Sequence, residues 1–262
     1  MKKSKLPTIL KAILFPCISI FCFLLIWQIG VSTTSLGNVL AGPIPVIREF
    51  VMGFVKPIGK YTMPIHIFWS MKRVIPAYLF GSFSGVLIGI LMGWYPMINA
   101  IFRPFYNLLR PIPPIAWIPL AILWFGIGDA SKYFLIFLAA FMPIVMNSCA
   151  GVISVDPTLI KCGQMLGASN GQIFLTVVIP ASVPYIFAGL QVGLSGAWAT
   201  IVAAEMIRST EGIGWIIVTS QDTNNSVQTL VGIIAIGLMG YILAVIMRKL
   251  EEVLCRWNRR EI

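Results

Sequence analysis

Residues able to carry catalytic or metal chemistry are scarce in this sequence. Of its 262 residues, one is a histidine, His66, and nine are aspartate or glutamate. A single histidine excludes an HExxH metal site and a histidine-rich metal cluster, and the scattered acids give no carboxylate cluster. No GxxxxGK followed by Ser or Thr occurs, so the chain has no phosphate-binding loop of its own for ATP. We therefore expect no enzymatic activity, no metal and no cofactor.

Cysteine pairs and nucleic-acid motifs are also missing. The five cysteines occur singly, without a CxxC pair, which argues against a zinc site and a disulfide scaffold. The net charge is +10, but the basic residues form no stripe with interleaved aromatics and accompany no binding motif. We expect no nucleic-acid partner.

Hydrophobic residues dominate what remains. They make up 58% of the chain against 11% charged residues, whereas about a quarter of a soluble domain is charged. Several apolar stretches approach the roughly 20 residues that a helix needs to cross a bilayer. The sequence predicts an all-α polytopic membrane protein with about six transmembrane helices, at residues 10–29, 74–94, 105–125, 132–150, 184–206 and 227–247.

The segments between these spans define the expected topology. The first apolar run is longer than the core of a signal peptide and lacks a convincing cleavage site, so we interpret it as an uncleaved span. Lys and Arg are more frequent on the side that holds both termini, which the positive-inside rule assigns to the cytoplasm. Residues 31–73 and 207–226 then lie outside and residues 151–183 inside.

Two spans have unusual residue patterns. Five prolines between residues 104 and 119 predict that the third span is kinked or partly unwound inside the bundle, where neighbouring protein satisfies the freed backbone groups. Gly81, Gly85, Gly89 and Gly93 lie along one face of the second span and allow close approach of another helix. That helix could belong to the same chain or to a second chain across a dimer interface.

The cytoplasmic segment 151–183 is apolar and weakly charged, which is costly for a loop in water unless a partner covers it. It predicts one helix from about Pro157 to Leu166, a break at Gly167, and a second helix in which Ser169 and Gln172 form a capping box. Pro180 and Pro184 are expected to end this unit before the fifth span. The segment is therefore predicted to be a docking surface.

These same residues resemble the Glu-Ala-Ala loop of ATP-binding-cassette (ABC) importer permeases. The family pattern places its glycine on Gly167 and its later positions on Val177, Ile179 and Pro180, with the spacing kept. Its opening triplet falls on Lys161, Cys162 and Gly163, so a lysine stands where the family has glutamate. Residues 108–160 in addition resemble the central region of nitrate, sulfonate and taurine permeases, and the resemblance extends over about residues 40–250.

The resemblance implies the type I ABC importer permease fold in the cell membrane of a prokaryote. It also implies the partners: two copies of an ABC ATPase, a second permease chain expected to be identical, an extracytoplasmic solute-binding protein, and the surrounding membrane lipid. The chain would divide into an N-terminal span with an external amphipathic segment (1–65), a transmembrane domain (66–250) that contains the coupling loop, and a cytoplasmic tail (251–262).

Candidate site residues fall into two groups. The ATPase-coupling group implied by the resemblance is Lys161, Gly163, Leu166, Gly167, Ala168, Ser169, Ile173, Phe174 and Pro180. The translocation-pathway group is Arg110, Trp117 and Glu205. An ionisable group at membrane depth is a functional candidate by default. Alternatively, Arg110 fixes unwound backbone or reaches the headgroups, Trp117 is a packing aromatic, and Glu205 is wetted at the external surface, which we favour for Glu205.

Two other functions are alternatives to an importer permease. A secondary transporter or channel would work without an ATPase, which the predicted docking loop disfavours. A membrane enzyme or scaffold would need a reactive group of residues that the sequence lacks. The resemblance points to a small anionic solute of the nitrate, sulfonate or taurine type, without identifying it.

Overall fold

The computed structural model describes residues 6–207 and 209–255, and every regular element among them is helical. Five helices are long and apolar enough to span a membrane, and a bent helix pair brings the number to six. The prediction of an all-α protein with about six spans is confirmed. The residues at both ends of the chain, on which the expected cytoplasmic location of the termini partly depends, lie outside the described residues, as does Arg208.

The chain forms two compact units, of which the first comprises residues 1–64 and 216–234. It contains the first span, α1 (Leu6–Thr33), the short helix η1 (Ser35–Asn38) and α2 (Pro43–Met52). Trp27 Nε1 donates a hydrogen bond to the carbonyl of Ala41 at 3.1 Å, which ties α1 to the segment before α2. The segment that we predicted to be external contains a helix that begins at Pro43, a residue suited to the first turn because its missing N–H needs no partner there.

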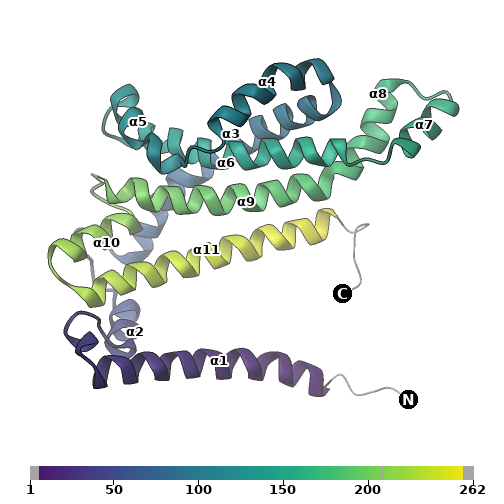
Figure 1. Ribbon diagram of the computed structural model, residues 1–262. Helices are drawn as coiled ribbons and strands as arrows, with labels where there is room; N and C mark the ends of the chain where they lie inside the picture. The colour runs from purple at the N-terminus through teal and green to yellow at the C-terminus, as the bar shows by residue number, and fades with distance from the viewer. Residues whose placement is uncertain (1–5, 208, 256–262) are drawn as a thin grey trace. The chain divides into compact units, whose positions relative to one another are not determined.

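The second unit comprises residues 65–215 and 235–262 and holds the regions that concern function. Its elements are most of α3 (Met63–Trp94), then α4 (Pro96–Leu109), η2 (Pro114–Trp117), α5 (Ile118–Phe125), α6 (Asp129–Ile153), α7 (Pro157–Met165), α8 (Asn170–Ile173), η3 (Phe174–Val178), α9 (Ile179–Met206), the start of α10 (Ile213–Asp222) and most of α11 (Ser226–Leu254). In Figure 1, α6 and α9 run side by side, with α7 and α8 at one end and α5 at the other.

Glycines place α6 in backbone contact with helices on two sides. A Cβ added to Gly89 of α3 would lie 2.5 Å from the Val145 carbonyl oxygen, and one added to Gly93 would lie 2.6 Å from Val152 Cβ. On α9, a Cβ at Gly193 would lie 2.8 Å from Ile144 Cδ1. The glycine stripe of α3 therefore packs within the chain, which confirms the first of the two alternatives.

Three boundaries differ from the prediction. The expected third span, 105–125, is two helices, α4 and the α5 region, that meet at an angle of 85°. The break falls at residues 110–113, where Pro111 and Pro113 cannot donate backbone hydrogen bonds. Pro180 and Pro184 do not end the cytoplasmic unit but lie within the first turns of α9. Finally, α3 begins at Met63 and so includes Lys72 and Arg73, which we expected in the external loop.

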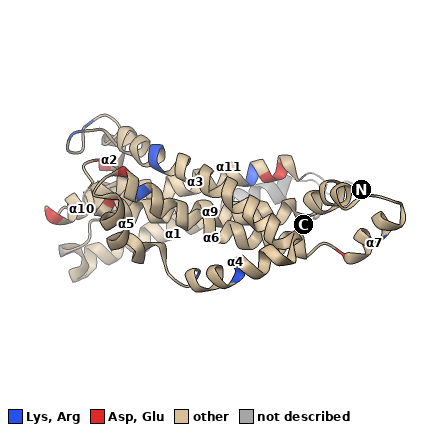
Figure 2. Ribbon diagram, turned by 90° about the horizontal axis from the view of Figure 1, so that it is seen from above, with Lys and Arg blue, Asp and Glu red and all other residues tan. Residues whose placement is uncertain are grey.

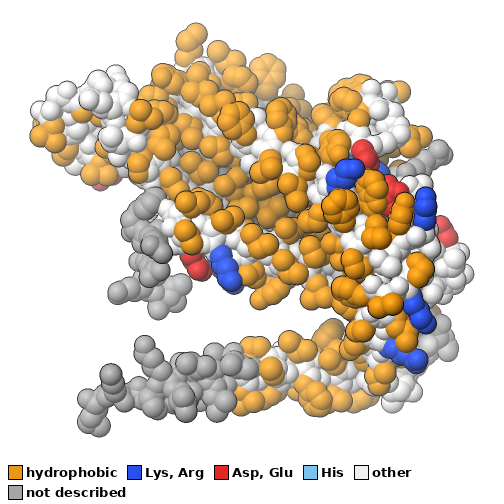
Figure 3. Space-filling view, turned by 180° about the vertical axis from the view of Figure 1, so that it is seen from behind, with side chains coloured by type: hydrophobic (Ala, Val, Ile, Leu, Met, Phe, Trp, Pro, Cys, Tyr) orange, Lys and Arg blue, Asp and Glu red, His pale blue; other side chains and the backbone are white. Residues whose placement is uncertain are grey.

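The surface of the second unit fits a lipid environment. Figure 3 shows hydrophobic side chains covering most of the visible face of this unit. Between its ends, α6 carries no charged residue after Lys132 and α9 none before Glu205, as the uncoloured middle stretches of both helices show in Figure 2. The charged residues that α6 and α9 do carry lie near the ends of these helices.

Candidate functional site

Two short helices, α7 and α8, form the predicted docking surface. Asp156 caps α7, because its carboxylate accepts a hydrogen bond from the Thr158 N–H at 2.8 Å. That bond lowers the pKa of Asp156 by favouring the charged form. Ser169 and Gln172 form the predicted capping box at the start of α8, with hydrogen bonds of 3.3 and 2.8 Å. Both predicted helices are thus confirmed.

Gly167 makes the turn between them. Its φ of +79° lies in the left-handed region that favours glycine. The Gly167 N–H donates to the Gln164 carbonyl and the Ala168 N–H to the Gly163 carbonyl, both at 3.0 Å. This bond pair is a Schellman motif, which satisfies two carbonyls at the end of α7. The predicted break at Gly167 is confirmed, and its cause is the backbone conformation.

The outer face of this turn is apolar and open. Met165 is 86% exposed and Leu166 is 88% exposed, and Leu159 of α7 and Leu175 of η3 are exposed as well. We call these four side chains the apolar ledge. Ile173 instead is 2% exposed and packs with Val152, Val155 and Val178, while Phe174 and Ala168 pack at the edge of this core.

The remaining coupling candidates surround the ledge. Lys161 and Ser169 are exposed, Gly163 lies over Ile173, and Pro180 is half-buried in the first turn of α9. A Cβ on Gly163 would lie 3.1 Å from Ile173 Cγ1, so this glycine allows α7 to approach α8. Among the described residues, no carboxylate forms an ion pair with Lys161, which is the one cation of α7.

A cavity of about 420 Å³ brings together two of the three pathway candidates, Arg110 and Trp117. Its walls come from α4, η2, α6 and α9, with Asn147 as a further polar group. Arg110 is exposed, and within residues 6–207 and 209–255 no carboxylate forms an ion pair with it. The volume is in the range typical of pockets for small molecules.

Glu205, the third pathway candidate, does not line that cavity. It is 1% exposed, so our preferred interpretation of a wetted surface residue is wrong. Its carboxylate accepts hydrogen bonds from Ser70 Oγ at 2.8 Å, from Arg73 Nη1 at 2.9 Å and from the Gly214 N–H at 3.1 Å. Fixed donors therefore replace the water that this charge loses on burial.

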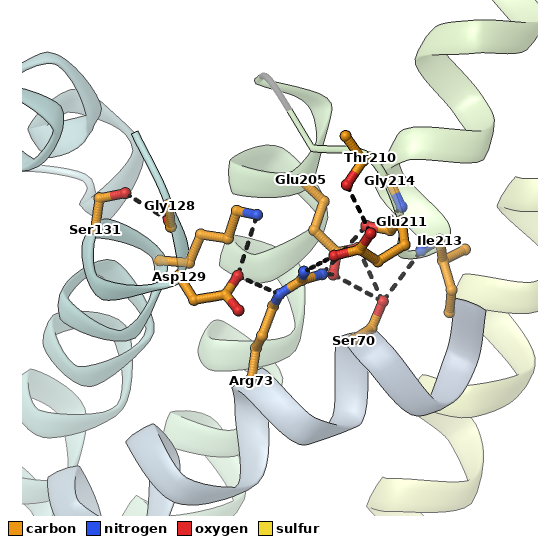
Figure 4. Close-up of polar contacts among 11 residues, drawn as sticks. Ser70, Arg73, Gly128, Asp129, Ser131, Glu205, Thr210, Glu211, Ile213 and Gly214 are labelled. Atoms are coloured by element: carbon orange, nitrogen blue, oxygen red, sulfur yellow. Dashed lines mark hydrogen bonds and ion pairs between the residues drawn. The ribbon is translucent and has the colours of Figure 1, made fainter. Parts of the chain in front are cut away.

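Arg73 is the centre of this ionic network. Figure 4 shows its guanidinium between Asp129 on one side and Glu205 and Glu211 on the other. Nε donates to Asp129 Oδ1 at 2.7 Å and Nη2 to Glu211 Oε1 at 2.7 Å, so one cation, 2% exposed, forms ion pairs with carboxylates from three segments. Lys132 adds a second cation, 3.4 Å from Asp129 Oδ1.

Backbone groups complete the network from the loop before α10. Ser70 Oγ accepts a hydrogen bond from the Ile213 N–H, and buried His66 accepts one from the Gly212 N–H at Nδ1. Gly212 has a φ of +114°, and a Cβ there would collide with the Glu205 carboxylate. Burial alone would raise the pKa of Glu211, but hydrogen bonds from Thr210 and Arg73 hold that pKa below its usual range.

The sequence did not reveal Arg73 as the partner of Glu205, or Asp129 and Glu211 as further partners of Arg73. Arg73 and Glu205 are 132 residues apart, and nothing local pairs them. The available signal was the continuous apolar pattern on both sides of Lys72 and Arg73, which places the pair inside a span. Among the described residues, no three His, Cys, Asp or Glu side chains lie where they could hold a metal ion.

Comparison with known proteins gave two kinds of match in sequence. Residues 85–259 match the model of the family described as binding-protein-dependent transport system inner membrane component. A probable ABC transporter permease protein of Brucella abortus is 36% identical over 234 residues, 89% of this chain and 91% of its own. The taurine transport system permease protein TauC of Escherichia coli is 34% identical over 90% of this chain and 86% of its own, and the nitrate import permease protein NrtB of Leptolyngbya laminosa is 32% identical over 86% and 82%.

A solved structure agrees in fold. An inward-facing form of the MetNI methionine ABC transporter superposes with a TM-score of 0.62 over 73% of this chain and 95% of the matched chain, at 16% sequence identity. At that identity the match concerns the fold alone.

Proposed function

Because the chain belongs to the binding-protein-dependent transport system inner membrane component family, we propose that it passes a small anionic solute through the cavity that Arg110 lines. The chain is the multi-pass permease subunit of an ABC importer, and its family works with an ATPase and a solute-binding protein. The alternative of a secondary transporter or channel is not favoured.

The observation that carries the anion proposal is the unpaired guanidinium in the cavity. An arginine within a membrane protein is costly unless water, a partner or a ligand solvates it. A nitrate or a sulfonate offers a pair of oxygens that a guanidinium can bind with two parallel hydrogen bonds. Relatives named for taurine and for nitrate transport are consistent with this class of solute.

We further propose that the apolar ledge is the coupling surface. Two ATPase subunits, in which ATP hydrolysis takes place, would each cover one ledge in an assembly with a second, identical permease chain. Burial of Met165 and Leu166 in an ATPase groove would remove these side chains from water. The binding protein would dock at the opposite end, both termini would lie in the cytoplasm, and lipid would surround the spans.

The anion proposal is tested in proteoliposomes that contain the permease, its ATPase and its binding protein. The Arg110→Gln variant should take up the solute at least about tenfold more slowly, the loss of one charge-assisted pair, while Arg110→Lys retains part of the rate. Arg103→Gln removes an exposed arginine of α4 that does not line the cavity and serves as the matched control. Equal uptake by Arg110→Gln and Arg103→Gln would contradict an anion site at Arg110.

The coupling proposal is tested by affinity purification of the tagged permease in mild detergent. A cassette ATPase should copurify with the full chain and be lost when residues 157–175 are deleted. A clean preparation of the full chain without any ATPase would instead support the secondary-transporter alternative.

A further inference from the structure

The ionic network connects the helices that wall the solute cavity. Asp129 begins α6, which also supplies Leu138 and Met142 to the cavity, and Glu205 ends α9, which also supplies Val192. Arg73 lies on α3, which supplies no residue to that cavity. Arg73, which lies outside the cavity, thus binds carboxylates at the ends of two helices that line the cavity.

The three carboxylates around Arg73 differ in their access to water. The Glu205 side chain is 0% exposed, the Glu211 side chain 20% and the Asp129 side chain 41%. Separation of Arg73 from Glu205 would leave the Glu205 carboxylate buried without its charge partner, which is strongly unfavourable. Separation from Asp129 would leave a carboxylate that water can rehydrate, so this ion pair is the one that can open and close.

The segment next to Asp129 contains two glycines with free space around them. The chain turns from α5 into α6 through Gly126, with a φ of +75°, and Gly128, and a Cβ added to either would meet no atom within 4 Å. We call residues 126–129 the α5–α6 corner. Leu123 and Trp124 in the last turn of α5 are exposed, whereas Ile118 and Ala121 in its first half are packed against the core.

We propose that Arg73 is a positioning residue for transport and acts as a latch. Its ion pair with Glu205 stays closed throughout the transport cycle. Its ion pair with Asp129 opens during the cycle and releases the α5–α6 corner. The latch would control the end of the η2–α5 segment, whose other end carries Trp117 of the cavity. The proposal relies on the permease function of the chain but not on the anionic nature of the solute or on Arg110.

The first test compares Asp129→Asn with Asp222→Asn in the complex of permease and ATPase. Asp222 is an exposed carboxylate with no ion pair among the described residues, so it is the matched control. Asp129→Asn should raise the ATPase rate without binding protein by about 1.4- to 5-fold, the shift that loss of one accessible ion pair gives a two-state equilibrium. Asp222→Asn should leave that rate unchanged. Equal rates in the two variants would overturn the latch.

The second test needs no substitution and so does not depend on the stability of a variant. Hydrogen exchange is measured on the wild-type complex at rest and trapped with ATP and vanadate. Amides at residues 122–126, which include the Gly126 N–H bonded to Ile122, should exchange faster in the trapped state, while those at 212–214 stay protected by His66, Ser70 and Glu205. Exchange that changes at both segments together, or at neither, would overturn the proposal.

The two proposals can fail separately. Loss of uptake in Arg110→Gln with a normal response of the ATPase to the binding protein concerns the anion site alone. A raised ATPase rate in Asp129→Asn concerns the latch alone, whichever solute is carried.

Discussion

The two ends of the second unit depart from the usual rules of burial in opposite ways. At α7 and α8, large apolar side chains are exposed, with Leu166 at 88%. At the other end, charged side chains are enclosed, with Arg73 at 2% and Glu205 at 1%. The apolar ledge lacks the neighbours that would cover it, whereas the ionic network has its partners within the chain.

This difference separates two kinds of dependence. Substitutions in a surface that needs a partner should leave the folding of the chain intact and abolish transport. A network that is complete within the chain should be destabilised when its buried cation is removed, because Glu205 then stays buried without its charge partner. Substitutions matched between the two ends can therefore distinguish a docking surface from an internal support.

The largest effect is expected from a bulky residue at Gly167. In Gly167→Val, a β-branched side chain cannot readily adopt the φ of +79°, so the turn between α7 and α8 changes and the ledge is misplaced. Uptake should fall to background while the amount of permease inserted in the membrane stays near wild type. Gly171→Ala, also in open space but without a left-handed φ, is the control. Wild-type uptake in Gly167→Val would argue against a coupling role.

The next effect should come from the buried cation. Arg73→Met leaves Glu205 enclosed without its charge partner and should lower the free energy of unfolding by about 3–5 kcal/mol. Thermal unfolding of the purified permease in detergent measures the loss. Lys72→Met removes the neighbouring, exposed cation and should cost far less. Similar melting temperatures for the two variants would contradict the supporting role of the network.

A smaller effect compares two glycines that share a left-handed φ. Gly167→Ala and Gly212→Ala each strain the backbone by about 1–2 kcal/mol. Only at Gly212 does the new methyl group also collide with a neighbour, the Glu205 carboxylate, because nothing lies within 4 Å of a Cβ at Gly167. Gly212→Ala should therefore melt at the lower temperature. Equal melting temperatures would mean that the Glu205 carboxylate moves away from the new methyl group without loss of stability.

The smallest effect is expected at the cap of α7. The hydrogen bond from the Thr158 N–H lowers the pKa of Asp156, so the cap stabilises α7 above the unfolded pKa of about 3.9 and is lost as pH falls through the lower folded value. Asp156→Asn caps the helix without titrating. The measurement is the hydrogen-exchange protection of the first turn of α7 in the wild type, divided by the protection of the same turn in Asp156→Asn. This ratio should be constant above about pH 4 and decrease below it. A constant ratio at all pH values would exclude the cap as the titrating group.

Local features were readily predicted from the sequence. The capping box of Ser169 and Gln172 and the break at Gly167 each depend on residues within one or two turns of each other. The ends of the spans were less predictable. Lys72 and Arg73 suggested a loop because two cations in a span are costly, and α3 was expected to begin at residue 74.

The carboxylates of residues 129, 205 and 211 offset the cost of burying the Arg73 charge, and only the folded chain brings them together. Because the sequence does not reveal this long-range pairing, it predicted that water solvates Glu205 at the external surface. Likewise, the prolines between residues 104 and 119 predicted a break in the third span but not its angle of 85°, which packing against α6 and α9 decides. The roles of Arg110 and Trp117 remain predictions, now with a shared cavity.

The backbone contacts of α6 with α3 and α9 have a mechanical consequence. These helices leave no free space between them, because a Cβ added to Gly89, Gly93 or Gly193 would lie under 3 Å from an atom of α6, so a slide of α6 by one turn would require repacking on both sides. The three helices should therefore behave as one stiff plate during a transport cycle. Changes of shape are left to the joints at its margins. These are the α5–α6 corner, the proline bend at residues 110–113 and the π-helical turn at residues 174–178, where regular helical hydrogen bonding is already interrupted.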